Sequence, residues 1–205
     1  MRFVHTGLSY RDKIASSVSI LREPFKISNS KFLLPFNPVV TDAHIKPSIA
    51  FFGYNAYCND SDFSQAQDQQ NFAEWCQGSY NSKLFSVLSL WKNALELPSE
   101  RRAIYYTNFI KLVLREKYFT KAKAVDSVLA KYTESQNLFT EMAVTEVEHL
   151  KSLGCKTFIC FGWAVYWLMQ PVASKTGIHL IREYHFSRYS RNNTEKLLNE
   201  YTVKI

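Results

Sequence analysis

Short, uninterrupted apolar runs are the clearest pattern along this chain. Residues 49–52, Ile-Ala-Phe-Phe, form one such run, which stops at Gly53 and is too short for a helix. Runs of this kind are typical of strands that are buried on both faces, as in parallel sheets. The pattern predicts four such strands, at residues 49–52, 103–106, 156–161 and 178–181.

Between these strands, apolar residues recur at the three- and four-residue spacing of amphipathic helices. Residues 138–153 show this spacing most strongly, and they are followed by Gly154, a residue type that suits the left-handed end of a helix. We also predict a helix at residues 163–169 and expect it to stop at Pro171. Further helices are predicted at residues 9–21, 62–76, 83–97 and 191–201.

Strands that alternate with helices predict an α/β fold. We expect a three-layer sandwich with a central four-stranded parallel sheet, because parallel sheets are covered by helices on both faces. No repeat, low-complexity tract or linker divides the 205 residues, so we expect a single domain. Residues 1–44 are less regular and are interpreted as an N-terminal extension packed on that domain.

The composition is that of a globular protein, with 46% hydrophobic and 21% charged residues. A net charge of +7 fits an anionic partner, and nucleic acid is the commonest one. The four cysteines include no C-x-x-C pair, and no apolar stretch is long enough to span a bilayer or to act as a signal peptide. We therefore expect a cytoplasmic monomer without a metal, another cofactor or a membrane partner.

The residues just after each strand carry the candidate chemistry, because ligands of parallel sheets bind beyond the carboxyl ends of the strands. These segments are Gly53-Tyr54-Asn55-Ala56-Tyr57, Thr107-Asn108, Gly162 and residues 184–190. Each feature alone has an ordinary structural explanation: glycine permits a tight turn, asparagine caps helices, and a single histidine is usually a satisfied or surface residue. Their order along the chain is more informative than any one of them.

That order resembles the uracil-DNA glycosylase superfamily. The family has a G-Q-D-P-Y or G-x-N-P motif after its first strand, a later strand that ends in asparagine, and a late H-P-S-x-x-S loop. Residues 53–57 are similar to the first motif, Asn108 is similar to the strand-end asparagine, and residues 185–190, His-Phe-Ser-Arg-Tyr-Ser, match H-x-S-x-x-S. Ala56 and Phe186 replace the two prolines, which fix the backbone φ angle in the family.

The resemblance implies a DNA-repair hydrolase that flips a base out of single- or double-stranded DNA and cuts its N-glycosidic bond. The implied catalytic residues are His185, which would donate to the departing base, and Asn55, which would hold the attacking water. The implied base-binding residues are Gly53, Tyr54, Tyr57, Tyr80 and Asn108. The implied nucleic-acid contacts are Ser187, Arg188, Tyr189, Ser190 and Arg191, with Tyr189 at the position of the family's wedge.

The basic residues fall into two groups. Arg182, Arg188 and Arg191 alternate with aromatic residues, a mixture typical of nucleic-acid contacts. Residues 111–123 contain five further basic residues, beginning with Lys111, which we interpret as a solvated helix face.

Two other functions remain open. The first is a catalytically inactive nucleic-acid-binding relative of the same fold, suggested by Ala56, Phe186 and the amide at Asn55. The second is an unrelated α/β domain that binds a nucleotide or sugar phosphate at the same strand ends. The low count of six glycines argues against that second alternative, since the chain has no glycine-rich phosphate loop.

Overall fold

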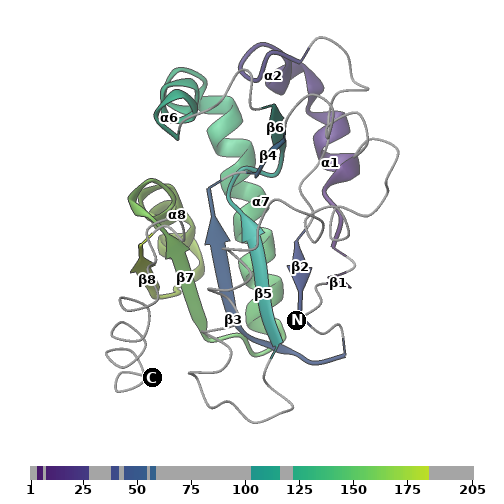
Figure 1. Cartoon of the computed structure of the whole chain (residues 1–205), viewed down its shortest axis with the longest axis vertical. Coiled ribbons are helices and arrows are strands. Elements are labelled where there is room, and N and C mark those ends of the chain that lie inside the picture. The colour runs from purple at the N-terminus through teal and green to yellow at the C-terminus, as the bar shows by residue number, and fades with distance from the viewer. Residues whose placement is uncertain are drawn as a thin grey trace.

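The structure is a computed structural model, and it describes residues 4–6, 8–27, 38–41, 44–54, 56–58, 103–115 and 122–184. Its main sheet has six strands in the order β1-β2-β5-β3-β7-β8 (Figure 1). The bounds of these strands are Val4–His5 for β1, Val39–Val40 for β2, Pro47–Gly53 for β3, Ala103–Asn108 for β5, Thr157–Phe161 for β7 and Leu180–Glu183 for β8. A second sheet pairs β4 (Ala56–Cys58) with β6 (Val113–Arg115).

The described helices are α1 (Arg11–Ser16), α2 (Val18–Arg22), α6 (Ala122–Lys131), α7 (Thr133–Ser152) and α8 (Trp163–Thr176). None of them is long and apolar enough to cross a membrane. The helices predicted at residues 62–76, 83–97 and 191–201 lie outside the described residues.

All four predicted strands are present, and they form the block β5-β3-β7-β8 in which every neighbouring pair is parallel. The α/β class is therefore confirmed. The sheet as a whole is mixed, however, and not the four-stranded parallel sheet predicted from the sequence. Residues 1–44 add β1 and β2 by antiparallel pairing, Val39 opposite Tyr106 and Val40 opposite Tyr105. A strand of two residues is too short to show a period, so only its pairing reveals it.

The strand order within the parallel block identifies one special position. Along the chain the four strands follow one another as β3, β5, β7 and β8. Across the sheet they lie in the order β5-β3-β7-β8, so the second strand of the chain lies beside the first on the side away from the third. From β3 the chain continues to β5 on one side, whereas from β7 it continues to β8 on the other. Such a reversal is a topological switch point, and the crevice beyond the carboxyl ends there is where open α/β sheets bind ligands. The switch point of this protein lies between β3 and β7.

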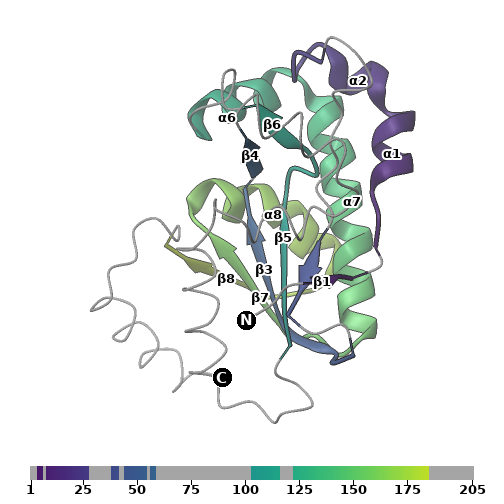
Figure 2. The ribbon, with the colours of Figure 1, turned by 45° about the vertical axis from the view of Figure 1, so that its right-hand side comes forward.

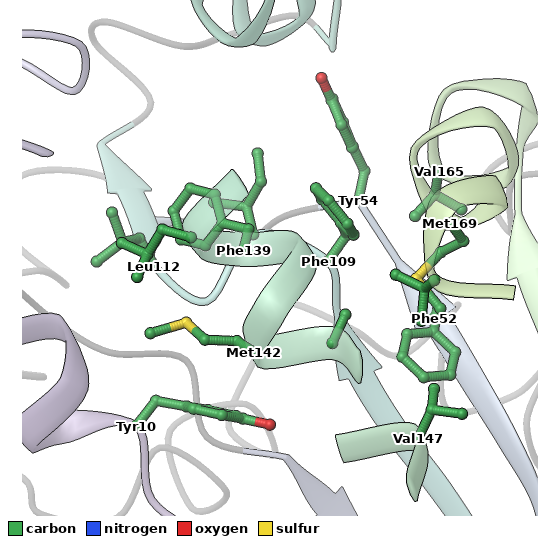
Figure 3. Close-up of a cluster of buried hydrophobic side chains, with 14 of the residues drawn as sticks. Tyr10, Phe52, Tyr54, Phe109, Leu112, Phe139, Met142, Val147, Val165 and Met169 are labelled. Carbon is green, nitrogen blue, oxygen red and sulfur yellow. The ribbon is translucent and has the colours of Figure 1, made fainter. Parts of the chain in front are cut away.

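Helices α7 and α8 lie side by side on the same face of the sheet (Figures 1 and 2). The connections from β5 to β7 and from β7 to β8 both progress in one direction across the sheet, and right-handed crossovers then place both helices on one face. Phe52 points into the core between them, beside Val147 of α7 and Val165 and Met169 of α8 (Figure 3).

The opposite face of the sheet is buried as well. Ile49 and Phe51, which alternate with the core residues Ala50 and Phe52, are at most 2% exposed. The predicted helices at 62–76 and 83–97, which were expected to help complete the three-layer sandwich, fall outside the described residues. Within the described part, the sheet therefore has a helical layer on one face and a buried apolar second face.

The helix predicted to stop at Pro171 instead continues through it to Thr176, so that prediction was wrong. Val165, Met169, Val172 and Thr176 form one buried stripe with helical spacing on both sides of the proline. Burial of this stripe outweighs the single backbone hydrogen bond that proline removes. The helix ends instead at Gly177, whose left-handed φ of 70° closes it with a hydrogen bond to the carbonyl of Ala173.

The N-terminal segment is built into the rest of the structure. The helix predicted at 9–21 occurs as two pieces, α1 and α2, which meet at Ser17. Ile14 and Leu21 are at most 1% exposed and belong to the same core cluster as the residues of α7. Residues 8–27 thus contribute to the main core, as expected of a segment that packs on the domain.

Candidate functional site

The carboxyl ends of the four parallel strands meet at one edge of the sheet. Gly53 of β3 lies opposite Asn108 of β5, and Phe161 of β7 lies opposite Glu183 of β8. We call these four residues the carboxyl edge. The switch point lies within it, between Gly53 and Phe161, so this edge is the first place to look for a ligand site.

Gly53 and Asn108 are in close contact at this edge. A Cβ atom on residue 53 would lie 2.2 Å from Oδ1 of Asn108 and 2.5 Å from the hydroxyl oxygen of Tyr106. Both distances are far below van der Waals contact, so only glycine leaves room for these two side chains. Gly53 is therefore required here by its close neighbours, in addition to any turn that follows it.

The amide of Asn108 is held in a defined orientation. Asn108 is 2% exposed, and its Oδ1 accepts a hydrogen bond of 3.0 Å from the hydroxyl of Tyr106. Tyr106 and Asn108 are two residues apart on one strand, so their side chains lie on the same face of the sheet. The hydrogen bond leaves Nδ2 of Asn108 as a donor and a second lone pair on Oδ1 as an acceptor.

An aromatic pair lies beside this polar group. The rings of Phe51 and Phe161 are stacked, with centroids 5.1 Å apart and planes 15° from parallel. They come from the two strands that flank the switch point, β3 and β7. Phe51 precedes Gly53 by two residues and so shares its face of the sheet. The switch point thus has one oriented amide next to a stacked aromatic pair, and all three side chains are at most 2% exposed.

The two tyrosines of the first motif have different positions. Tyr54 is 7% exposed and belongs to the core cluster (Figure 3), where its hydroxyl donates a short hydrogen bond to Asp126 of α6. Tyr57 lies in β4, opposite Leu114 of β6. The structure therefore places Tyr54 on the α7 side of the sheet, whereas Asn108 lies on the other side.

Lys111 does not lie on a solvated helix face, which was the interpretation of the basic residues at 111–123. Its side chain is fully buried, and the segment 113–115 forms strand β6. The Nζ of Lys111 forms an ion pair with Glu146 of α7 and donates a hydrogen bond of 2.6 Å to Oγ1 of Thr107. A buried charge is tolerated only with such compensation, because removing an ammonium group from water is costly.

Glu146 connects Lys111 with a second strand residue. Its Oε1 accepts a hydrogen bond of 2.6 Å from the hydroxyl of Tyr105, while Oε2 faces Lys111. The ring of Tyr10 lies close to the same group, 5.1 Å from Nζ of Lys111. The network therefore joins the N-terminal segment, β5, α7 and the segment after Asn108.

Burial changes the proton affinity of this network. Desolvation lowers the pKa of Lys111, and the neighbouring charge of Glu146 opposes this shift. Desolvation also raises the pKa of Tyr105 and of Tyr10, and the charge of Glu146 raises both further. Because both pKa values are raised, the two phenols keep their protons at alkaline pH values at which an exposed tyrosine ionises.

The network also positions the carboxyl edge. Only two residues separate Asn108 from Lys111, and the backbone between them is bonded to β3 and the residue after it: Phe109 N donates to Gly53 O at 2.8 Å and Ile110 N to Tyr54 O at 3.0 Å. The Lys111–Glu146 pair anchors the end of this segment to α7. The orientation of Asn108 thus depends on a helix that follows it in sequence by 25 residues or more.

Tyr106, Lys111 and Glu146 were not identified as site residues from the sequence, although the sequence around each of them contains a feature that indicates its position. Tyr106 is two residues before Asn108 and therefore had to share its face of the strand. Lys111 interrupts an apolar run, Phe-Ile-Lys-Leu-Val-Leu, at residues 109–114. Glu146 occupies the buried stripe of α7, four residues after Met142 and four before Leu150.

Several predicted site residues lie outside the described residues. They are Asn55, Tyr80, His185, Ser187, Arg188, Tyr189, Ser190 and Arg191. Of the residues implied by the resemblance, the structure therefore brings together Gly53 and Asn108. Within the described ranges, no three histidine, cysteine or acidic side chains are grouped so that they could hold a metal ion.

A cavity of about 290 Å³ occurs at the opposite end of the sheet. It is lined by residues that precede β3, such as His44 and Lys46, and by His149 near the end of α7. Among the described residues, Gly53, Tyr54 and Asn108 do not contribute to its lining. This cavity and the carboxyl edge are separate features of the molecule.

The fold and this edge define the class of protein: an α/β protein with a mixed sheet and a polar group, Asn108, on the strand next to its topological switch point. Comparison with models of protein families, with curated proteins and with solved structures gives no match for the chain.

Proposed function

We propose that this chain binds DNA and hydrolyses the N-glycosidic bond of uracil or a related damaged base at the carboxyl edge. The observation that carries the proposal is the direct contact of Gly53 with Asn108, because these residues belong to two of the three motifs that resemble the glycosylase superfamily. They are 55 positions apart in the sequence, and their contact beside the switch point is what a shared base pocket requires.

The chemistry assigns a task to each group. A uracil edge presents a donor beside an acceptor, and the amide of Asn108 has N–H donors on Nδ2 and a second lone pair on Oδ1 besides the one that accepts from Tyr106. The departing base carries negative charge, which a neutral His185 would stabilise with an N–H. Asn55 would orient the attacking water but cannot take its proton, so we expect slow, orientation-dependent hydrolysis.

The test is cleavage of labelled single- and double-stranded DNA that contains one uracil, followed by alkali to break abasic sites. We expect cleavage that disappears in His185→Ala. Gly53→Ala should reduce it roughly 5- to 150-fold, because the new Cβ would displace the Asn108 amide and because loss of oriented hydrogen bonds to a substrate costs about 1–3 kcal/mol.

Gly177→Ala is the matched control for Gly53→Ala. Gly177 has a left-handed φ of 70° and nothing within 4 Å of an added Cβ, so alanine there strains the backbone far from the carboxyl edge. Equal activity of the two variants would contradict the role given to Gly53 and Asn108. Absence of cleavage on uracil, hypoxanthine, xanthine and mismatched thymine would refute base excision altogether.

A second candidate is a nucleic-acid-binding protein of the same fold without the reaction. Asn108 is only 2% exposed and its Oδ1 already accepts from Tyr106, which restricts how closely a base can approach it. Ala56 and Phe186, in place of two prolines, favour the same alternative. Tight DNA binding without any alkali-sensitive product would support it.

A further inference from the structure

The exposed large hydrophobic side chains of the described residues all lie in one place. They are Trp163 (54% exposed), Trp167 (62%) and Tyr184 (49%). Trp163 and Trp167 are on the first turns of α8, and Tyr184 directly follows β8, which lies beside that helix (Figure 1). A gathering of exposed rings is uncommon on a soluble protein and indicates an interaction surface.

The rings form an ordered group, which we call the aromatic platform: Trp163, Tyr166, Trp167, Arg182 and Tyr184. Trp163 and Trp167 are stacked, with centroids 5.9 Å apart and planes 15° from parallel. Tyr166 meets both tryptophans edge-on, at 6.0 and 5.5 Å. Residues three and four apart on a helix share one face, so these three rings project together from α8.

Arg182 adds a positive charge to this surface. Its guanidinium carbon lies 3.7 Å from the centroid of the Trp163 ring and 5.9 Å from that of Tyr184. Stacking on an aromatic face leaves the planar N–H groups of arginine directed outward, where they can bond phosphate oxygens. The adjacent Glu183 is 2% exposed, and its carboxylate accepts the backbone N–H of Tyr184 at 2.8 Å.

Flat exposed rings next to an arginine match single-stranded nucleic acid. Unpaired bases stack on aromatic side chains, whereas the bases of a duplex are already stacked on one another. The net charge of +7 favours a polyanion. The charged side chain packed on these rings, that of Arg182, is a cation.

We infer that the aromatic platform binds single-stranded nucleic acid by stacking of an unpaired base on Trp167, which itself stacks with Trp163, and that Arg182 contacts the adjoining phosphate. Trp163 follows the carboxyl end of β7 by two residues, so a strand on the platform would extend from the carboxyl edge along α8. The inference rests on the nucleic-acid-binding part of the proposed function and does not require base excision.

The test measures fluorescence anisotropy of a labelled, uracil-free oligothymidylate of roughly 12 nucleotides, with a duplex of the same length as comparison. Trp167→Ala should weaken single-strand binding about 5- to 100-fold, the range expected for loss of one stacked base. Trp167→Phe should retain most of the affinity. Ser174→Ala, an exposed position on the same helix, is the control and should bind like the original chain.

Salt dependence tests the role of Arg182 separately. Arg182→Met should reduce the slope of log affinity against log salt by roughly 0.7, the contribution of one phosphate contact on a single strand. An unchanged slope would show that Arg182 contacts no phosphate and would overturn that part of the inference. Circular dichroism of each variant checks that it is folded.

The outcomes separate this inference from base excision, since the oligonucleotide contains no uracil. If Trp167→Ala binds the single strand as tightly as the original chain, the platform is not a base-stacking site. If the original chain binds no single strand but self-associates in sedimentation, and Trp167→Ala is monomeric, the platform is an interface between copies and the inference is overturned. Binding that depends on Trp167 supports it, whether or not any base is cut.

Discussion

The Lys111–Glu146 ion pair makes Glu146→Gln the most informative test of the fold around the carboxyl edge. Both side chains are completely buried. Glutamine keeps the volume and one acceptor oxygen but leaves the Lys111 ammonium without a countercharge. Removing one partner of a buried pair typically destabilises a protein by about 3–5 kcal/mol, because the remaining charge stays uncompensated.

That loss is large relative to the whole stability, since domains are stable by only about 5–15 kcal/mol. For a chain of this size it corresponds to a fall in Tm of roughly 10 °C. Urea unfolding followed by far-UV circular dichroism measures the free energy, and thermal unfolding measures the Tm. We expect an unchanged urea m-value, because the same surface is exposed on unfolding.

Glu148→Gln is the matched control, two residues further along α7. Glu148 is 51% exposed and lies 3.3 Å from Lys151, itself 39% exposed. Exposed pairs of this kind contribute at most about 1 kcal/mol, so this variant should unfold almost like the original chain. If Glu146→Gln is no less stable than Glu148→Gln, the argument that the buried pair anchors the carboxyl edge is refuted.

A double variant isolates the pair itself. In Lys111→Met with Glu146→Gln, neither charge of the pair remains, and glutamine can still accept a hydrogen bond from the hydroxyl of Tyr105. We expect this variant to be more stable than Glu146→Gln alone, with a coupling energy of about 1–3 kcal/mol. Strict additivity of the two single changes would show that the ion pair has no energetic coupling.

Two further predictions concern pH and thiol reactivity. Burial and the charge of Glu146 raise the pKa of Tyr105 and Tyr10, so above pH 10 unfolded tyrosines lose protons that the folded chain keeps. Stability should then fall by about 1.4 kcal/mol per pH unit for each phenol, and Tyr105→Phe should remove the part of this slope that Tyr105 causes. Burial raises the pKa of Cys155 to about 12 and also raises that of Cys160. In a variant whose other two cysteines are serine, thiol reagents at pH 8 should label these two only after unfolding, and rapid labelling of the folded chain would contradict their burial.

The sequence by itself determined the elements whose patterns are local. Four short apolar runs became the four parallel strands, because residues buried on both faces need no alternation. The amphipathic spacing at 138–153 became most of α7, and its buried stripe continued upstream to Ser135. From the strand ends it also followed that Gly53 and Asn108 would lie at one edge.

Only the tertiary structure decided what depends on partners distant in the chain. The pairing of Val39 and Val40 with β5 has no local signal, and it turned the expected parallel sheet into a mixed one. Helix α8 continues through Pro171 because its buried residues on both sides of the proline pack against the same core. Lys111 is buried because Glu146, 35 positions later, faces it across the core. From its charge alone, a lysine is predicted to be exposed to solvent. A lysine can be buried only beside a countercharge, and the local sequence does not show where that countercharge lies in space.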